Sequence, residues 1–211
     1  MFKIRIIAIC LILLLLTIES NCQNNIKWSN KMIYFVCRGT SHKVGLIAKE
    51  FNLKDSSLTH IGLGIFINDS LKIFNVSNDE KDKKNSNLLC QSFEEFANVQ
   101  NIVTLRIYKK KVSRNKRKKI IYSLGNFNNK QIVFDYAFSL KNEDSLYCSE
   151  FILKILNLSD VIKNLSKFEN MKKLSEFQKF VLKKDYLLYI PVDFFFLLKK
   201  VKLEYIKNFA N

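Results

Sequence analysis

Short apolar runs separated by polar turns dominate the chain from residue 32 to residue 108. Residues 58–66 and 71–76 flank a polar turn, so they predict a β-hairpin. Residues 102–108 alternate apolar and polar side chains, which is the pattern of a half-buried strand. The expected strands are residues 32–37, 58–66, 71–76 and 102–108, with further candidates at 186–191 and 201–205.

Between these runs, apolar residues recur three and four positions apart, which predicts amphipathic helices. Ser41 is a plausible cap for the first helix, Ser92 and Glu95 have capping-box spacing, and Asp144 or Ser145 can cap a later helix. The expected helices are residues 41–51, 92–99, 113–124 and 146–156, with one or two more within 160–184. The pattern therefore predicts one α+β domain.

The chain has 211 residues, of which 48% are hydrophobic, and only 5 Gly and 1 Pro. Such a chain can bury a core of ordinary size, so disordered, collagen-like and linker-like architectures are excluded. Lysine and arginine outnumber aspartate and glutamate by 35 to 19, which gives a net charge of +16.

The N-terminus has the layout of a secretory signal peptide. Lys3 and Arg5 precede an apolar run over residues 6–18, and polar residues begin at Glu19. This run is short for a membrane span, which needs about 20 apolar residues. We expect residues 1–22 to be a signal peptide, residues 23–211 to be the exported domain, and the protein to be periplasmic, secreted or lipid-anchored in a bacterial envelope. Cys22 occupies the lipidation position of a degenerate lipobox, so a lipoprotein and a simply secreted protein both fit.

Much of the positive charge lies in one run, residues 109–119. The run is interpreted either as a solvated helix face or as a surface attracted to anionic lipid headgroups or acidic polymers. No nucleic-acid-reading motif accompanies the charge, so nucleic acid is not an expected partner.

Three of the five cysteines, Cys37, Cys90 and Cys148, lie in the expected domain. They form no disulfide framework, although a Cys37–Cys90 bridge is compatible with an oxidising compartment. Neither Cys-x-x-Cys nor His-x-x-x-His spacing occurs, so zinc is not expected.

Three predicted elements bring together residues that suit nucleophilic catalysis. His60 lies on one strand of the expected hairpin, Asn75 on the other, and Cys148 in the first turn of a helix. A helix N-terminus and a neighbouring imidazolium both lower the pKa of a thiol, and an Asn carbonyl can orient the imidazole. The chain contains one other histidine, His42, on a helix expected to be exposed.

Four segments, taken in their order along the chain, resemble the circularly permuted papain-like amidases and peptidases of the YiiX type, in the NlpC-like branch of the papain superfamily. Residues 33–41 resemble that family's opening strand and Arg-Gly-x-Ser turn, and residues 58–65 resemble its His-bearing strand. Residues 72–76 resemble the strand of its third polar residue, and residues 134–152 resemble its Tyr-Cys-Ser-Glu ending. Histidine before cysteine is the permuted order.

The resemblance implies a permuted papain-like (NlpC-like) fold, in which a small antiparallel sheet or half-barrel packs on helices. It also implies attack by Cys148 on an amide or ester carbonyl, proton transfer by His60 and orientation of His60 by Asn75. This chemistry requires no metal or organic cofactor. Many relatives have Glu at the third position, so a Cys-His-Asn triad is a departure from their pattern. Residues 157–211 match nothing in the family and are expected to be a C-terminal extension that caps the cleft or contacts substrate.

Further residues are expected around this site. Ser41 and Tyr147 are the candidates for contacting substrate, and the turn at Arg38 is expected to line the cleft. Asp135 and Glu150, with Tyr147, are expected to support the loop and the helix.

The resulting hypothesis is an exported cysteine-dependent hydrolase that acts on a peptide, amide or acyl-lipid of the cell envelope. The alternative is a catalytically inactive papain-like module that binds a lipid or a peptide.

Overall fold

The computed structural model describes residues 26–41, 45–78, 86–163 and 170–209. The predicted signal peptide 1–22, which includes Cys22, and the second histidine, His42, lie outside these ranges, as does most of the polar loop expected over residues 78–87. No helix in the described ranges combines the length and the apolar character that crossing a bilayer requires.

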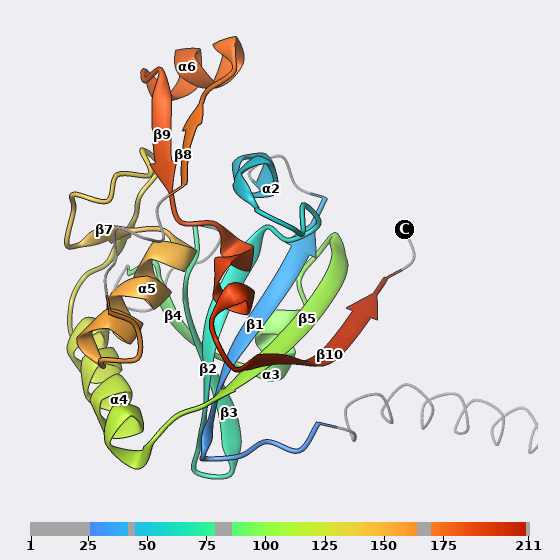
Figure 1. Cartoon of the computed structure of the whole chain (residues 1–211), viewed down its shortest axis with the longest axis vertical. Helices are drawn as coiled ribbons and strands as arrows, with labels where there is room; N and C mark the ends of the chain where they lie inside the picture. Colours follow the sequence, from blue (N-terminus) through green and yellow to red (C-terminus); the bar gives the residue numbers. More distant parts are fainter. Residues whose placement is uncertain (1–25, 42–44, 79–85, 164–169, 210–211) are drawn as a thin grey trace, which may run out of the picture.

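A six-stranded sheet forms the centre of the molecule, in the order β10-β5-β1-β2-β3-β4, with all neighbouring strands antiparallel (Figure 1). Its strands are β1 (Met32–Thr40), β2 (His60–Ile67), β3 (Ser70–Val76), β4 (Leu88–Ser92), β5 (Ile102–Lys111) and β10 (Val201–Asn208). The predicted α+β class is confirmed, and so are the strands expected between residues 32 and 108. The sheet is larger than the small sheet that was expected, because β4 and β10 extend it at both edges.

Both faces of β1 are buried, which explains its continuous apolar sequence. Ile33, Phe35 and Cys37 join one hydrophobic cluster, and Tyr34 and Val36 join a second cluster on the other face. A strand covered on both faces needs no polar positions along its length.

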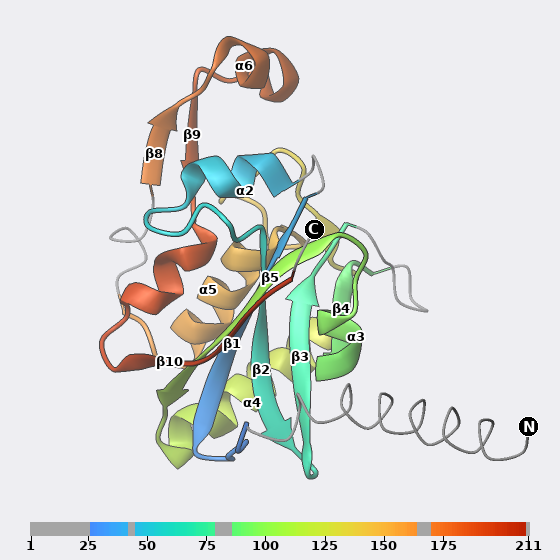
Figure 2. The same ribbon diagram turned by 90° about the vertical axis from the view of Figure 1, so that its right-hand side faces the viewer.

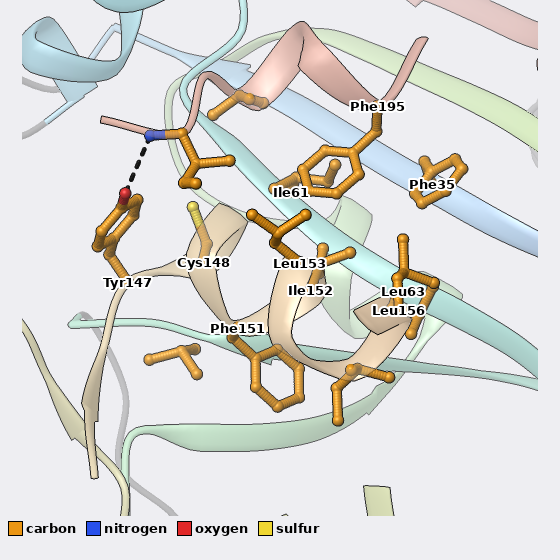
Figure 3. Packing of buried hydrophobic residues seen from close by; sticks show 14 of the residues in the cluster. Phe35, Ile61, Leu63, Tyr147, Cys148, Phe151, Ile152, Leu153, Leu156 and Phe195 are labelled. Carbon is orange, nitrogen blue, oxygen red and sulfur yellow. Dashed lines mark hydrogen bonds between the residues drawn. The ribbon is translucent and has the colours of Figure 1, made fainter. Parts of the chain in front are cut away.

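Helices cover the two faces unequally (Figures 1 and 2). The larger cluster contains residues from α4 (Arg114–Asn128), α5 (Cys148–Leu158) and the 3₁₀ helix η4 (Val192–Leu197), and the smaller one contains Phe96 of α3 (Phe93–Ala97). Figure 3 shows α5 packed against β2, with Ile152, Leu153 and Leu156 near Ile61 and Leu63. This packing fixes the start of α5 beside the start of β2.

Two helices begin at other residues than predicted. Ser41 does not cap the first helix, because α2 (Leu46–Phe51) begins after Gly45. Neither Asp144 nor Ser145 caps α5, whose N-cap is Tyr147. Ser145 belongs to β7 (Ser145–Leu146), which pairs with β6 (Val133–Phe134) in a short parallel ladder and keeps the chain extended until Tyr147.

The helices predicted within residues 160–184 are wrong in part. The described residues of this segment include one helix, α6 (Glu176–Leu182), and a strand, β8 (Asn170–Lys173). β8 pairs antiparallel with β9 (Tyr186–Tyr189), which lies within the strand expected at 186–191. The three elements project from the rest of the molecule as an arm (Figure 1).

The chain beyond residue 157 also contributes to the centre of the domain. Phe195 of η4 stacks on Phe35, with ring centroids 5.3 Å apart. Buried Asp193 accepts hydrogen bonds from the N–H groups of Leu53, Lys54 and Asp55, at 2.9, 2.5 and 2.9 Å. The C-terminal segment therefore anchors the loop at residues 53–55, which precedes β2.

Cys37 and Cys90 do not form a disulfide, since both are free thiols. Cys37 is on β1 and Cys90 on β4, with β2 and β3 between them. Neighbouring strands are about 4.8 Å apart, so these residues are separated by more than the roughly 7 Å that a disulfide can span between Cα atoms.

The basic run 109–119 does not form one helix face. Its first residues end β5, and the rest begin α4, which is capped by Ser113. Several of its side chains contact the protein: Lys109 pairs with Glu204, Lys119 pairs with Asp160, and Arg117 donates to the carbonyl oxygen of Phe66 at 2.7 Å.

Candidate active site

His60 is held at the start of β2 by a neighbouring strand. Its Nε2 lies 2.9 Å from Oδ1 of Asn75 on β3. A carbonyl oxygen can only accept a hydrogen bond, so Nε2 carries the proton and Nδ1 of the neutral ring is left with a lone pair. The ring nitrogen of His60 that can accept a proton is therefore Nδ1.

The fully buried side chain of Asn75 is fixed in turn by Gln91 of β4. The Asn75 amide nitrogen donates to Oε1 of Gln91 at 2.9 Å, which determines which end of the Asn75 side chain faces His60. The sequence reasoning missed Gln91, because the β3–β4 pairing that brings it beside Asn75 has no signal in the residues themselves.

Gly62 makes room for a ring beside His60. A Cβ at Gly62 would lie 2.4 Å from Ile73 Cγ2 and 3.1 Å from Phe96 Cε2. Phe96 stacks on the imidazole of His60, with ring centroids 5.6 Å apart and an interplanar angle of 25°. The small residue two positions after His60 therefore allows an aromatic wall on one side of the imidazole.

Cys148 is the first residue of α5, so its predicted place in the first helical turn is confirmed. Hydrogen bonds from backbone groups of Ile61, Ser149 and Cys148 itself act to lower the pKa of its thiol. Figure 3 shows Cys148 next to Tyr147, whose hydroxyl accepts a hydrogen bond from the Ile190 N–H at 3.0 Å.

Cys148 and His60 line the same cavity, which has a volume of about 410 Å³. Tyr147 also lines it, and its ring stacks on Tyr189 at a centroid distance of 4.8 Å and an interplanar angle of 12°. The C-terminal segment thus contributes one wall of this cavity through Tyr189. From the sequence, this segment is expected to cap the cleft or contact substrate, but the pattern does not single out Tyr189.

Ser41, the other residue expected to contact substrate, is not among the residues that line the cavity. It is exposed, directly follows the lining residue Thr40, and its N–H donates to the carbonyl oxygen of Asn101 at 3.0 Å. Asp135 supports a loop as expected, because its carboxylate accepts from the N–H groups of Ala137 and Ser139 at 2.9 and 2.5 Å.

Arg38 lines the cavity directly opposite His60 in the β1–β2 register. Its side chain is buried, donates a hydrogen bond to the Phe96 carbonyl oxygen at 2.8 Å, and lies 4.7 Å from the centroid of the Phe96 ring. Among the described lining residues, it is the one side chain that is charged at neutral pH.

Burial decides the charge state of the two candidate catalytic side chains, Cys148 and His60. It raises the pKa of Cys148 to about 11, against the opposing effects of the backbone hydrogen bonds and of Arg38. Desolvation and then the charge of Arg38 lower the pKa of His60 to about 3, although the Asn75 hydrogen bond acts in the other direction. The expectation of a thiol with a lowered pKa is therefore wrong for the resting protein, in which both groups are neutral.

Glu150 is a second buried ionisable group on α5. Burial raises its pKa to about 7, against the effect of Lys154, whose Nζ lies 3.3 Å from Glu150 Oε1. Its carboxylate is 3% exposed and lies one helical turn from Lys154, and the supporting role expected for it stays a prediction.

No protein-family model matches this sequence, and no curated protein matches it. Among solved structures, the fold is similar to that of the metalloprotein YiiX from Escherichia coli O157:H7. The match has a TM-score of 0.61 and 11% sequence identity, and it covers 85% of this chain and 99% of YiiX. The chain therefore has a YiiX-like fold.

The described residues do not fit a metal centre of the kind that the word metalloprotein implies for YiiX. Nowhere in the described ranges do three His, Cys, Asp or Glu side chains come together as a metal-ligand set.

Proposed function

We propose that this protein is a cysteine-dependent hydrolase that uses Cys148, His60 and Asn75 to cleave an amide or ester. The observation that carries the proposal is the 2.9 Å contact between His60 Nε2 and Asn75 Oδ1, in a cavity that Cys148 also lines. The order of these residues along the chain and the YiiX-like fold support a permuted papain-like architecture for it.

The neutral resting pair favours general-base attack. His60 Nδ1 removes the thiol proton of Cys148 as the sulfur bonds to the carbonyl carbon of the substrate. The tetrahedral intermediate then expels the amine or alcohol, which takes the proton from His60, and leaves an acyl-thioester on Cys148. A water molecule that loses a proton to His60 attacks this thioester, releases the acid and regenerates the thiol.

Backbone N–H groups at the start of α5 supply a site for the oxyanion. The first N–H groups of an α-helix have no partner within the helix and carry the positive end of its dipole. Cys148 is the first residue of α5, so its own N–H is the nearest of these donors.

The proposal places this activity in a bacterial cell envelope. The N-terminal signal-peptide pattern supports export, so the substrate would be a peptide, amide or acyl-lipid of the envelope. The basic run 109–119 would favour contact with an anionic membrane surface, although ion pairs such as Lys119–Asp160 already use part of its charge.

Acyl transfer from p-nitrophenyl acetate to the purified protein tests the proposal, with mass spectrometry to locate the acetyl group. We expect a transient acetyl-thioester on Cys148, no such adduct in Cys148→Ala, and much slower acylation in His60→Ala. Cys90→Ala and His42→Ala are the matched controls and should acylate Cys148 at the parental rate. Acylation of Cys148 no faster than that of exposed Cys90, and unchanged in His60→Ala, would overturn the enzyme proposal.

A second candidate function is a module with this architecture that binds a lipid or a peptide without turnover. The raised pKa of Cys148 and the lowered pKa of His60 favour it, because a neutral thiol is a weak nucleophile. This candidate predicts no acyl-enzyme with any ester, together with saturable binding that survives in Cys148→Ala.

A further inference from the structure

We propose that Arg38 makes the cavity beside Cys148 and His60 a site for a carboxylate, so that the preferred substrate carries a carboxylate close to the bond that is cleaved. The part of this proposal that concerns the substrate rests on the proposed function. The part that concerns carboxylate binding depends only on the residues that line the cavity.

The sheet places Arg38 where such a group would be bound. Arg38 and His60 are direct cross-strand partners in the β1–β2 ladder, and such partners project side chains from the same face at about 5 Å. Both side chains line the cavity, and Cys148 lines it too. A carboxylate that reaches Arg38 therefore lies in the same cavity as the sulfur, and Arg38 is close enough to Cys148 to influence its thiol electrostatically.

The guanidinium is also fixed before any ligand arrives. The Arg38 guanidinium makes two contacts with Phe96. It donates a hydrogen bond to the Phe96 carbonyl oxygen at 2.8 Å, and it lies 4.7 Å from the centroid of the Phe96 ring. The same ring stacks on His60. Since the side chain is already ordered, little rotamer freedom is lost when an anion binds.

The charge of the described lining residues favours an anion. The described lining residues include one cation, Arg38, and no aspartate or glutamate. A guanidinium recognises a carboxylate through paired N–H donors, which are the strong class of hydrogen bond.

A bound carboxylate would also help His60 to act. Proton transfer from Cys148 makes His60 an imidazolium, and the charge of Arg38 opposes this protonation. A carboxylate on Arg38 offsets that charge, so a substrate of this class would raise the basicity of His60 when it binds. A neutral substrate would leave His60 a poor base.

Two alkylating reagents of nearly equal size test the proposal in the purified protein. Iodoacetate carries a carboxylate, iodoacetamide is neutral, and each forms a bond between sulfur and a methylene carbon with loss of iodide. The quantity measured is the ratio of their rate constants at Cys148, by peptide mass spectrometry. Cys90 is the reference thiol in the same molecule, since it is exposed on β4 with both Lys72 and Glu95 nearby.

We expect the iodoacetate-to-iodoacetamide ratio to be about tenfold higher at Cys148 than at Cys90, as for one charge-assisted contact. Arg38→Gln should lower the Cys148 ratio to that of Cys90, and Arg38→Lys should retain most of it. Arg114→Gln, which removes an exposed cation on α4, should change neither ratio. If Arg38→Gln slows both reagents equally, Arg38 acts only on the thiol and the proposal is overturned.

The wild-type protein provides a second test that does not depend on the folding of any variant. Acetate should protect Cys148 from iodoacetamide, and acetamide at the same concentration should not. Equal protection, or none, contradicts a carboxylate site. Preference for iodoacetate without acylation by p-nitrophenyl acetate would leave a carboxylate-binding module, whereas acylation without that preference would leave a hydrolase and remove the role of Arg38.

Discussion

The imidazole of His60 is held by Asn75 across the β2–β3 hairpin, with 2.9 Å between His60 Nε2 and Asn75 Oδ1. The amide of Asn75 is fixed by Gln91 on the next strand, so three strands in sequence determine the orientation of one ring. The arrangement leaves His60 Nδ1 as the accepting nitrogen and makes the role of each partner measurable.

Asn75→Ala should slow acylation of Cys148 more than Gln91→Ala does. The first variant removes the contact to His60, while the second leaves that contact and frees only the Asn75 amide. Orientation of a general base that contributes about 10²–10⁴-fold makes a loss of about tenfold to a hundredfold reasonable for Asn75→Ala. Initial rates with p-nitrophenyl acetate check this.

Unfolding free energies of the same two variants serve as the control. Asn75→Ala leaves buried partners unsatisfied and should cost about 1–3 kcal/mol. Equal rates for Asn75→Ala and the parent protein, measured where both are folded, would show that Asn75 is only a structural residue.

The hairpin that carries His60 and Asn75 could be predicted from sequence because its signals are local. Two apolar runs flank Asn68 and Asp69, which adopt positive φ values of 48° and 57°, as a tight hairpin turn requires. The capping box at Ser92 is also local and is confirmed. Cys148 was placed correctly in a first helical turn because α5 has a continuous apolar face.

Contacts between distant segments could not be predicted in this way. Tyr189 reaches the wall of the cavity from the arm, and Asp193 binds a loop about 140 residues earlier in the chain. The predicted start of α5 was wrong because β7 pairs with β6, and that pairing depends on the tertiary fold. The low thiol pKa was wrong for a similar reason, since the helix start is visible in the sequence and the burial of Cys148 is not.

Stability should fall between pH 6.5 and pH 4.5 because of His60. Its pKa is about 3 in the folded protein and about 6.5 in an unfolded chain, so only the unfolded chain takes up this proton in that range. The part of the unfolding free energy that depends on neutral His60 is fully present above pH 6.5 and is lost as the pH falls towards 3. Over this window we expect a loss of roughly 2 kcal/mol that is absent in His60→Gln.

Urea unfolding at a series of pH values measures this difference, and the NMR titration of the His60 ring checks its cause. The imidazole of His60 should remain neutral at pH 5. A midpoint near 6.5 would show that desolvation and Arg38 do not control this group.

Glu150→Gln should stabilise the protein at alkaline pH. Burial raises the pKa of Glu150 to about 7, so the stability linked to its protonated form is complete below the unfolded value of about 4.5 and is lost as pH rises through 7. At pH 8 the variant should gain up to about 3 kcal/mol, and at pH 4 it should match the parent protein.

Glu176→Gln is the matched control, since Glu176 is 90% exposed and pairs with Lys179 on the arm. Such surface pairs contribute about 0–1 kcal/mol, so this change should have little effect at either pH. Destabilisation of Glu150→Gln at pH 8 would mean that the ion pair with Lys154 outweighs the desolvation of the carboxylate.

Asp193→Ala should be among the most destabilising single changes outside the cavity. The buried carboxylate accepts hydrogen bonds from three successive backbone N–H groups, those of Leu53, Lys54 and Asp55. Each buried donor left without a partner costs about 1–3 kcal/mol, so a loss of at least about 3 kcal/mol is expected in urea unfolding. Asp160→Asn, which removes an exposed partner of Lys119, should cost less than about 1 kcal/mol.

The position of Asp193 adds a second consequence. The loop that it binds precedes β2 and His60, and Asp193 itself follows Tyr189 by four residues, so loss of this anchor loosens two walls of the cavity together. Asp193→Ala should therefore also slow acylation of Cys148 under conditions in which the protein is still folded. Parental acylation rates in a folded but destabilised variant would show that the cavity walls are held independently of this anchor.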